Sequence, residues 1–176
     1  MMRKILLWAP LMVFALFLGV FLRGLHAPEN TTITSKMVGK VVPDFALPAA
    51  VSSHPALTSD DLKQGKPILL NIFASWCLPC IAEAPVLEEL KRQGVEIHGI
   101  AIRDTPEDVA DFLGQHGDPY ARIGSDVSSQ VQISLGSSGV PESFVVDGQG
   151  VVRFQHIGDI RKDDVPKILA ALEDAK

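Results

Sequence analysis

The feature that most constrains the fold is an apolar run followed at once by the chain's only two cysteines. The run is Ile68-Leu69-Leu70-Asn71-Ile72-Phe73, and the cysteines follow in Trp76-Cys77-Leu78-Pro79-Cys80. A continuous apolar run of this length is typical of a strand that is covered on both faces of a sheet. The residues after Cys80 place apolar side chains at helical spacing. The sequence therefore predicts that the cysteines lie where a strand passes into a helix.

This junction favours a reactive thiolate at the first cysteine. A helix that begins near Leu78 leaves its first backbone N–H groups without internal partners, and their positive field stabilises a negative sulfur on Cys77. Cys77 is therefore the expected attacking sulfur. Cys80 lies one turn further along the helix, where it can face Cys77 and resolve a mixed disulfide. We interpret Cys77-Cys80 as a redox-active disulfide.

Three other uses of a cysteine pair fit the sequence less well. A structural disulfide across two intervening residues closes too short a loop to restrain much of the unfolded chain. A zinc site needs about four ligands, and the sequence has neither a second cysteine pair nor a His-x-x-x-His pattern. Covalent haem attachment requires a histidine after the second cysteine, whereas Ile81 stands there. We expect dithiol-disulfide exchange without a metal or another cofactor.

The length and charge of the chain limit what else it can do. With 176 residues and 47% hydrophobic content, the chain can bury one good-sized core after its N-terminus is set aside. The net charge is −5, and no basic cluster with interleaved aromatic residues is present. These features argue against a nucleic-acid partner.

The N-terminus has the character of a membrane anchor. Residues 5–22 carry no charge, and at about 1.5 Å per residue a helix over them nearly matches a hydrocarbon core of about 30 Å. Arg3 and Lys4 precede this run and place the N-terminus in the cytoplasm. A cleaved signal peptide is the alternative, although Leu25-His26-Ala27 is an indifferent cleavage site.

We therefore divide the chain into three parts. Residues 1–22 are expected to form a single-pass anchor in a bacterial inner membrane, residues 23–37 a linker, and residues 38–176 one domain in the periplasm. An oxidising compartment holds spare thiols as disulfides. A single cysteine pair in such a compartment therefore indicates disulfide exchange and not a structural disulfide.

The domain sequence predicts alternating strands and helices. Strands are expected within 38–47, at 68–73, 95–102 and 120–123, and in a hairpin of 143–146 with 151–157; helices are expected at 58–62, 78–93, 105–116, 126–136 and 162–175. This order is typical of an α/β domain with a mixed central sheet flanked by helices.

Several motifs in this order resemble the thioredoxin fold. They are Trp-Cys-x-Pro-Cys after the strand, Pro85 inside the following helix and Val140-Pro141 just before the hairpin. Longer stretches resemble the DsbE/CcmG group of membrane-anchored thiol:disulfide proteins of cytochrome c maturation. These stretches lie at residues 38–47, 65–71, 80–83, 118–121, 139–150 and 156–160. The resemblance covers nearly the whole chain, including an N-terminal extension and a central insert near 103–135.

The resemblance implies site residues and partners. Cys77 is implied as the nucleophile, Cys80 as the resolving cysteine, and Pro141 as a cis-proline that, with Val140, docks the substrate strand. The implied task is the reduction of disulfides in apocytochrome c or in a partner thiol protein of the same pathway. The implied electron source is a membrane reductant of the DsbD/CcdA kind.

Acidic residues near the predicted site favour a reductant. Glu83, about one turn after Cys80, and Glu142, beside Pro141, would add negative charge that opposes a thiolate on Cys77. An exposed helix acid at 83 and a solvated loop acid at 142 are the alternative interpretations.

Four other residues near the site need an interpretation. Asn71 occupies the position where thioredoxins usually have a buried proton-relaying Asp, so Glu83 is the candidate proton acceptor for Cys80. Trp76 is expected to shield the sulfurs and contact a docked peptide, with a core aromatic as the alternative. Arg103-Asp104 is either part of substrate docking or a surface ion pair.

Three other functions remain as alternatives. A general periplasmic disulfide oxidant or isomerase would share the cysteine pair and differ in reduction potential. The stretch 42–47 resembles the opening of thiol peroxidases, although Ala74 stands where those enzymes have Thr. A copper-binding thiol protein would use both cysteines with a distant histidine, but such proteins usually space their cysteines further apart.

Overall fold

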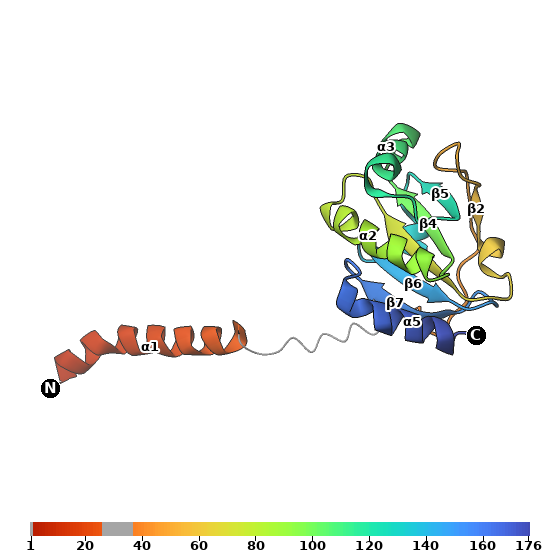
Figure 1. Ribbon diagram of the computed structural model, residues 1–176. Helices are drawn as coiled ribbons and strands as arrows, with labels where there is room; N and C mark the ends of the chain where they lie inside the picture. The colour runs from red at the N-terminus through yellow and green to blue at the C-terminus, as the bar shows by residue number, and fades with distance from the viewer. Residues whose placement is uncertain (1, 26–36) are drawn as a thin grey trace. The chain divides into compact units, whose positions relative to one another are not determined.

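A five-stranded mixed sheet forms the centre of the domain (Figure 1). The computed structural model describes residues 2–25 and 37–176, and in the first helix it describes the side chains of residues 8 and 10–22. In spatial order the strands are β5 (Arg122–Asp126), β4 (Ile97–Ile102), β3 (Ile68–Phe73), β6 (Glu142–Val146) and β7 (Val152–Ile157). Strands β3, β4 and β5 pair in parallel, whereas β6 and β7 run antiparallel to their neighbours. The predicted mixed sheet is confirmed.

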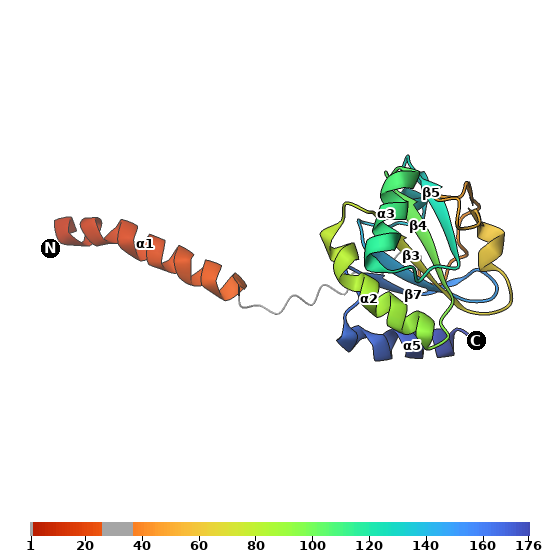
Figure 2. The same cartoon turned by 45° about the horizontal axis from the view of Figure 1, so that its top comes forward.

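Helices cover the sheet as the alternation of elements predicts. The helices are α2 (Leu78–Arg92), α3 (Pro106–His116), α4 (Gln130–Ser134) and α5 (Val165–Asp174), with short 3₁₀ turns η1 (Ser59–Leu62) and η2 (Lys162–Asp164). Helices α2, α3 and α5 lie on one face of the sheet (Figure 2). Helix α2 continues through Pro85.

Strand β3 is the centre of the core. All of its residues are buried, as the continuous apolar run predicts, and its two neighbours pair along nearly its full length. Phe73 and Phe144 are among the largest fully buried side chains. Asn71, in the middle of this strand, is the polar exception in an otherwise apolar run. Because Asn71 is buried, its side-chain amide needs hydrogen-bond partners inside the protein.

The predicted strand within 38–47 is wrong over most of its length. Only an isolated bridge at Val41, facing Val151, and the two-residue strand β1 (Ala46–Leu47) form there, and β1 pairs with β2 (Leu57–Thr58). Val42 still donates its N–H to Gly150, but Pro43 has no N–H with which to continue the ladder. The chain then leaves the sheet edge and packs Leu47 over β5.

Two elements in the central insert are shifted from their expected positions. The strand expected at 120–123 lies at Arg122–Asp126 and is β5. The helix expected at 126–136 is shorter than predicted and is limited to α4, at Gln130–Ser134. Asp126 is the last residue of β5, and its carboxylate accepts hydrogen bonds, each of 2.9 Å, from the N–H groups of Gln130 and Gln132. Asp126 therefore caps the helix from across a loop instead of beginning it.

The N-terminal helix α1 (Met2–Leu25) is described by itself. Among the residues that the structure describes, no helix has both the length and the apolar character needed to cross a membrane. The side chains at 2–7, 9 and 23–25 and all of 26–36 lie outside the described residues. The anchor at 1–22 and the linker at 23–37 stay predictions.

Candidate active site

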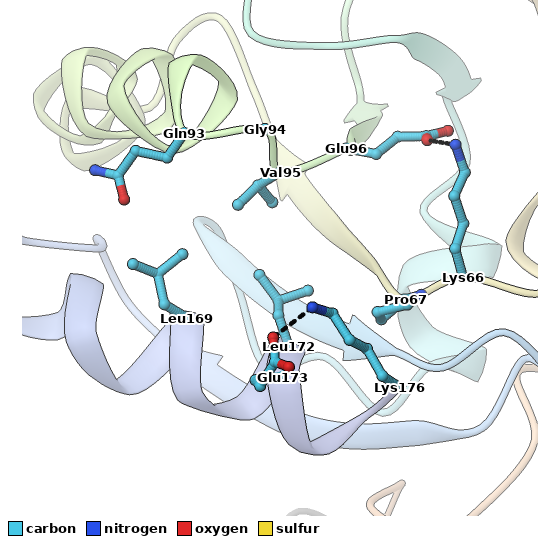
Figure 3. A pocket seen from close by; sticks show the side chains of 10 residues that line it. All are labelled: Lys66, Pro67, Gln93, Gly94, Val95, Glu96, Leu169, Leu172, Glu173 and Lys176. Carbon is cyan, nitrogen blue, oxygen red and sulfur yellow. Dashed lines mark hydrogen bonds and ion pairs between the residues drawn. The ribbon is translucent and has the colours of Figure 1, made fainter.

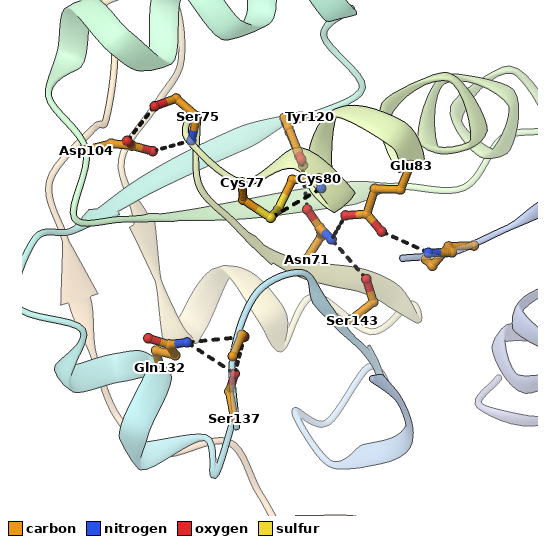
Figure 4. The surroundings of a disulfide bond; sticks show 12 residues. Asn71, Ser75, Cys77, Cys80, Glu83, Asp104, Tyr120, Gln132, Ser137 and Ser143 are labelled. Atoms are coloured by element: carbon orange, nitrogen blue, oxygen red, sulfur yellow. Dashed lines mark hydrogen bonds between the residues drawn. A yellow bond between two sulfur atoms is a disulfide. The ribbon is translucent and has the colours of Figure 1, made fainter. Parts of the chain in front are cut away.

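The two cysteines are joined by a disulfide across the first turn of α2 (Figure 4). Cys77 is the N-cap of the helix and Leu78 its first residue, as predicted. The Cα atoms of Cys77 and Cys80 are 5.2 Å apart, and the backbone N–H of Cys80 donates to the sulfur of Cys77 at 3.2 Å. In the reduced protein the same N–H points at the atom that carries the negative charge of a Cys77 thiolate.

The surface beside the disulfide is apolar and open. Trp76 is 56% exposed and Leu78 is 78% exposed, although both are large apolar side chains. The alternative that Trp76 is a core aromatic is therefore wrong. Cys77 is 5% exposed and Cys80 1% exposed, so an incoming sulfur meets Cys77 first.

The loop before β6 has the predicted backbone. The Val140-Pro141 peptide bond is cis. The side-chain amide of Gln132, on α4, donates to the carbonyl of Gly139 at 3.2 Å and thereby ties this loop to α4. Gln132 was not identified from the sequence, because its partner is a backbone carbonyl that only the folded loop presents.

Glu142 is buried, so the interpretation as a solvated loop acid is wrong. It is the first residue of β6 and is 1% exposed. Its carboxylate accepts the N–H of Ser138 at 2.8 Å and also a hydrogen bond from the side-chain amide of Gln155. Glu142 therefore fixes the loop that carries Pro141 from the other side.

Glu83 is also buried, so the interpretation as an exposed helix acid is wrong. It lies one turn after Cys80 on the buried side of α2 and is 1% exposed. One carboxylate oxygen accepts from the side-chain amide of Asn71 at 2.9 Å, and the other accepts from the backbone N–H of Ile160 at 3.0 Å.

The burial of Glu83 changes its protonation. Burial raises the pKa of its carboxyl to about 7; the charge of Asp159 acts in the same direction, and the hydrogen bonds from Ile160 and Asn71 oppose the rise. A carboxyl with this pKa exchanges a proton readily at neutral pH, which is the property expected of a proton acceptor for Cys80.

Asn71 is the hub of the polar network under α2 (Figure 4). Besides its bond to Glu83, its amide nitrogen donates to the hydroxyl oxygen of Ser143 at 3.0 Å. Its amide oxygen accepts from the hydroxyl of Tyr120 at 2.8 Å. The sequence singled out Asn71 by its position before the cysteines, but Tyr120 and Ser143 carried no local signal.

Arg103 and Asp104 do not form the ion pair that was one interpretation. Asp104 is buried, and its carboxylate accepts from the N–H of Ser75 at 2.8 Å and from the Ser75 hydroxyl at 2.6 Å. Arg103 has a φ of 51° and donates to the hydroxyl oxygen of Ser129 at 3.0 Å. Asp104 thus holds the loop that leads into Cys77, because the ends of the parallel strands β3 and β4 meet at the same edge of the sheet.

A separate cavity of about 340 Å³ lies at the opposite end of β3 and α2 (Figure 3). The apolar part of its lining includes Val95, Leu169 and Leu172, and the Lys66–Glu96 and Glu173–Lys176 ion pairs stand at its sides. Since the cysteines follow the other end of β3, this cavity is not part of their site.

The chain is similar to known thiol:disulfide interchange proteins over most of its length. A family model described as Redoxin matches residues 37–172. The thiol:disulfide interchange protein HelX of Rhodobacter capsulatus is 37% identical over 166 residues, which are 94% of each chain. A solved structure of a putative thiol:disulfide interchange protein DsbE from Chlorobium tepidum is 30% identical with a TM-score of 0.67, over 77% of this chain and 97% of that one.

A further solved structure bears on the fold alone. A putative thioredoxin from Neisseria meningitidis has a TM-score of 0.62 at 22% identity and covers 77% of this chain and 91% of its own. The thioredoxin-like fold expected from the sequence is confirmed by this likeness together with the observed mixed sheet.

Proposed function

Because the chain belongs to the Redoxin family, in the group of thiol:disulfide interchange proteins named DsbE and HelX, we propose that it reduces protein disulfides during cytochrome c maturation. The observation that carries this proposal is the Cys77–Cys80 disulfide across the first turn of α2, in which Cys77 is the more exposed of the two cysteines. The client is apocytochrome c or a cytochrome-assembly thiol protein.

The reaction proceeds by two exchanges of sulfur partners. The thiolate of reduced Cys77 attacks a client disulfide, the client S–S bond breaks, and one client sulfur leaves as a thiolate while the other stays bound to Cys77. Cys80 then loses its proton to the Glu83 carboxylate and attacks the sulfur of Cys77. The second client sulfur leaves as a thiolate, and the two client thiolates become thiols by taking up one proton from Glu83 and one from water. The two electrons that the client has gained come from the cysteine pair, which becomes the disulfide.

The buried acids support the reducing direction. An ionised carboxylate close to the cysteines disfavours a thiolate there, and a less stable thiolate makes the dithiol a stronger electron donor. Glu83 and Glu142 are both buried beside elements that carry the site. A general oxidant would need groups besides the N-terminus of α2 that stabilise the Cys77 thiolate strongly enough to outweigh these acids.

We also propose where the protein works. The uncharged run at 5–22 after Arg3 and Lys4 supports an inner-membrane anchor with the domain in the periplasm. In that compartment the oxidised pair needs a source of electrons across the membrane. A membrane reductant of the DsbD/CcdA kind would provide them by exchange with the Cys77–Cys80 disulfide.

The assignment is tested by trapping partners in the native membrane. In Cys80→Ser the second exchange is blocked, so mixed disulfides on Cys77 are expected to accumulate and to identify both the client and the reductant by mass spectrometry. The matched control is the double variant Cys77→Ser/Cys80→Ser, which should trap nothing. Recovery of neither a cytochrome-assembly protein nor a membrane reductant would contradict the pathway assignment.

A further inference from the structure

The sheet register places the amide of Asn71 in a row of three residues under α2. Asn71 on β3 lies directly opposite Gly99 on β4 and Ser143 on β6. Residues opposite one another across a sheet point to the same face. This arrangement explains why the Asn71 amide reaches the Ser143 hydroxyl on one side and finds no side chain on the other.

The space over Gly99 is filled by a residue of the insert. A Cβ atom at Gly99 would lie 3.0 Å from Cδ1 of Tyr120 and 2.9 Å from Cε1 of Phe73. The Tyr120 ring stacks on the Phe73 ring, with centroids 4.8 Å apart and planes inclined by 12°. Only a glycine at 99 lets the ring lie so close to β4, and this position brings its hydroxyl to within 2.8 Å of the Asn71 oxygen.

Donor and acceptor rules then fix the direction of the amide. An ionised Glu83 only accepts hydrogen bonds, so it must face the amide nitrogen of Asn71. Ser143 can donate or accept and does not discriminate between the two orientations. The Tyr120 hydroxyl does discriminate between the two orientations. Among the described residues, its hydrogen-bond acceptor is the side-chain oxygen of Asn71. If the amide turned over, the buried hydroxyl proton of Tyr120 would lose that acceptor.

We propose that Tyr120 is a positioning residue of the exchange reaction: its hydroxyl holds the Asn71 amide with the nitrogen toward Glu83 and so keeps Glu83 able to accept the Cys80 proton. The proposal rests on the proposed function and adds to it a role for the insert. The hydroxyl of Tyr120 donates to Asn71 and not to a sulfur, so Tyr120 acts through Asn71.

The charged groups around the network are consistent with this role. Burial above all, with the charges of Glu83 and Asp118, holds the pKa of Tyr120 well above its usual value, so the hydroxyl keeps its proton. Asp159, in the segment after β7, acts on Glu83 and raises its pKa. Neither Asp118 nor Asp159 is a hydrogen-bond partner of Asn71, so Glu83 and the Tyr120 hydroxyl set the amide orientation.

The test removes a single oxygen atom. Tyr120→Phe keeps the stacked ring but lets the Asn71 amide turn its oxygen toward Glu83, which favours the protonated carboxyl. By NMR titration of the Glu83 carboxyl carbon in the oxidised full chain in detergent, we expect its pKa to rise by about one pH unit. At pH 7 the ionised fraction, and with it the rate of the Cys80 step, should fall about fivefold and recover at alkaline pH.

Two further variants separate positioning from damage to the fold. Thr58→Val removes a hydroxyl that donates to Asp61 at 2.7 Å, outside the Asn71 network, and should change neither the titration nor the rate profile. In a Glu83→Gln background, Tyr120→Phe should no longer alter the pH profile. An unchanged Glu83 titration in Tyr120→Phe, or a rate loss that persists at all pH values or in the Glu83→Gln background, would overturn the proposal. Failure of the wild-type chain to reduce protein disulfides would instead overturn the proposed function.

Discussion

Replacement of Cys77 by Ser is expected to reduce disulfide exchange with protein substrates to the uncatalysed background. The attacking species is a thiolate, and a serine hydroxyl does not ionise at neutral pH. The backbone N–H of Cys80, now 3.2 Å from the sulfur, would then face a neutral oxygen. Stopped-flow measurement of the reaction between the reduced variant and a disulfide-bonded peptide gives the rate directly.

The matched control is the same change one turn further along α2. Cys80→Ser keeps the attacking sulfur, so its first exchange should proceed at a rate close to that of the wild type and stop at the mixed disulfide. If Cys80→Ser loses the first step and Cys77→Ser keeps it, the roles of the two cysteines are reversed. The small exposure of Cys77 and the smaller exposure of Cys80 argue against that result.

Glu83 is expected to make the stability of the oxidised protein depend strongly on pH. The pKa of its carboxyl is about 7 in the folded protein, against 4.5 for an ordinary glutamate side chain. Because the folded value is raised, the contribution of Glu83 to stability is fully present below about pH 4.5 and is lost as the pH rises through about 7. At 1.36 kcal/mol per pH unit, the loss is about 3 kcal/mol.

Urea unfolding at pH 5 and pH 8 tests this expectation. Between these values the free energy of unfolding of the wild type should fall by about 2.5 kcal/mol more than that of Glu83→Gln, which cannot ionise. Glu107→Gln, a change at an exposed acid in the first turn of α3, is the control and should follow the wild type. Parallel behaviour of Glu83→Gln and the wild type would show that the carboxyl titrates normally in the folded state.

The elements predicted well from the sequence are those whose signals are local. Strand β3 is a continuous apolar run, α3 carries Thr105 and Pro106 at its start, and the β6–β7 hairpin is marked by Asp147 and two glycines. Each of these signals acts within a few residues of the element. The cysteine pair at the start of α2 belongs to the same class.

The elements and residue roles that were predicted wrongly from the sequence depend on partners far along the chain. Asp126 is a residue type that often begins a helix, but here it ends β5 and its carboxylate caps α4 from there. The burial of Glu83 requires the backbone of Ile160, which lies far along the chain. Asp104 and Tyr120 likewise acquire their roles only when the insert packs beside β3, and no local pattern indicates such a meeting.

The chain has a single tyrosine, and this gives the network a spectroscopic label that needs no engineering. The phenol bands in an ultraviolet resonance Raman spectrum all come from Tyr120, whose hydroxyl donates to Asn71 in the structure. Those bands respond to whether a phenol donates or accepts a hydrogen bond. The polar contacts under α2 can therefore be followed in the unlabelled protein while electrons pass through the sulfurs.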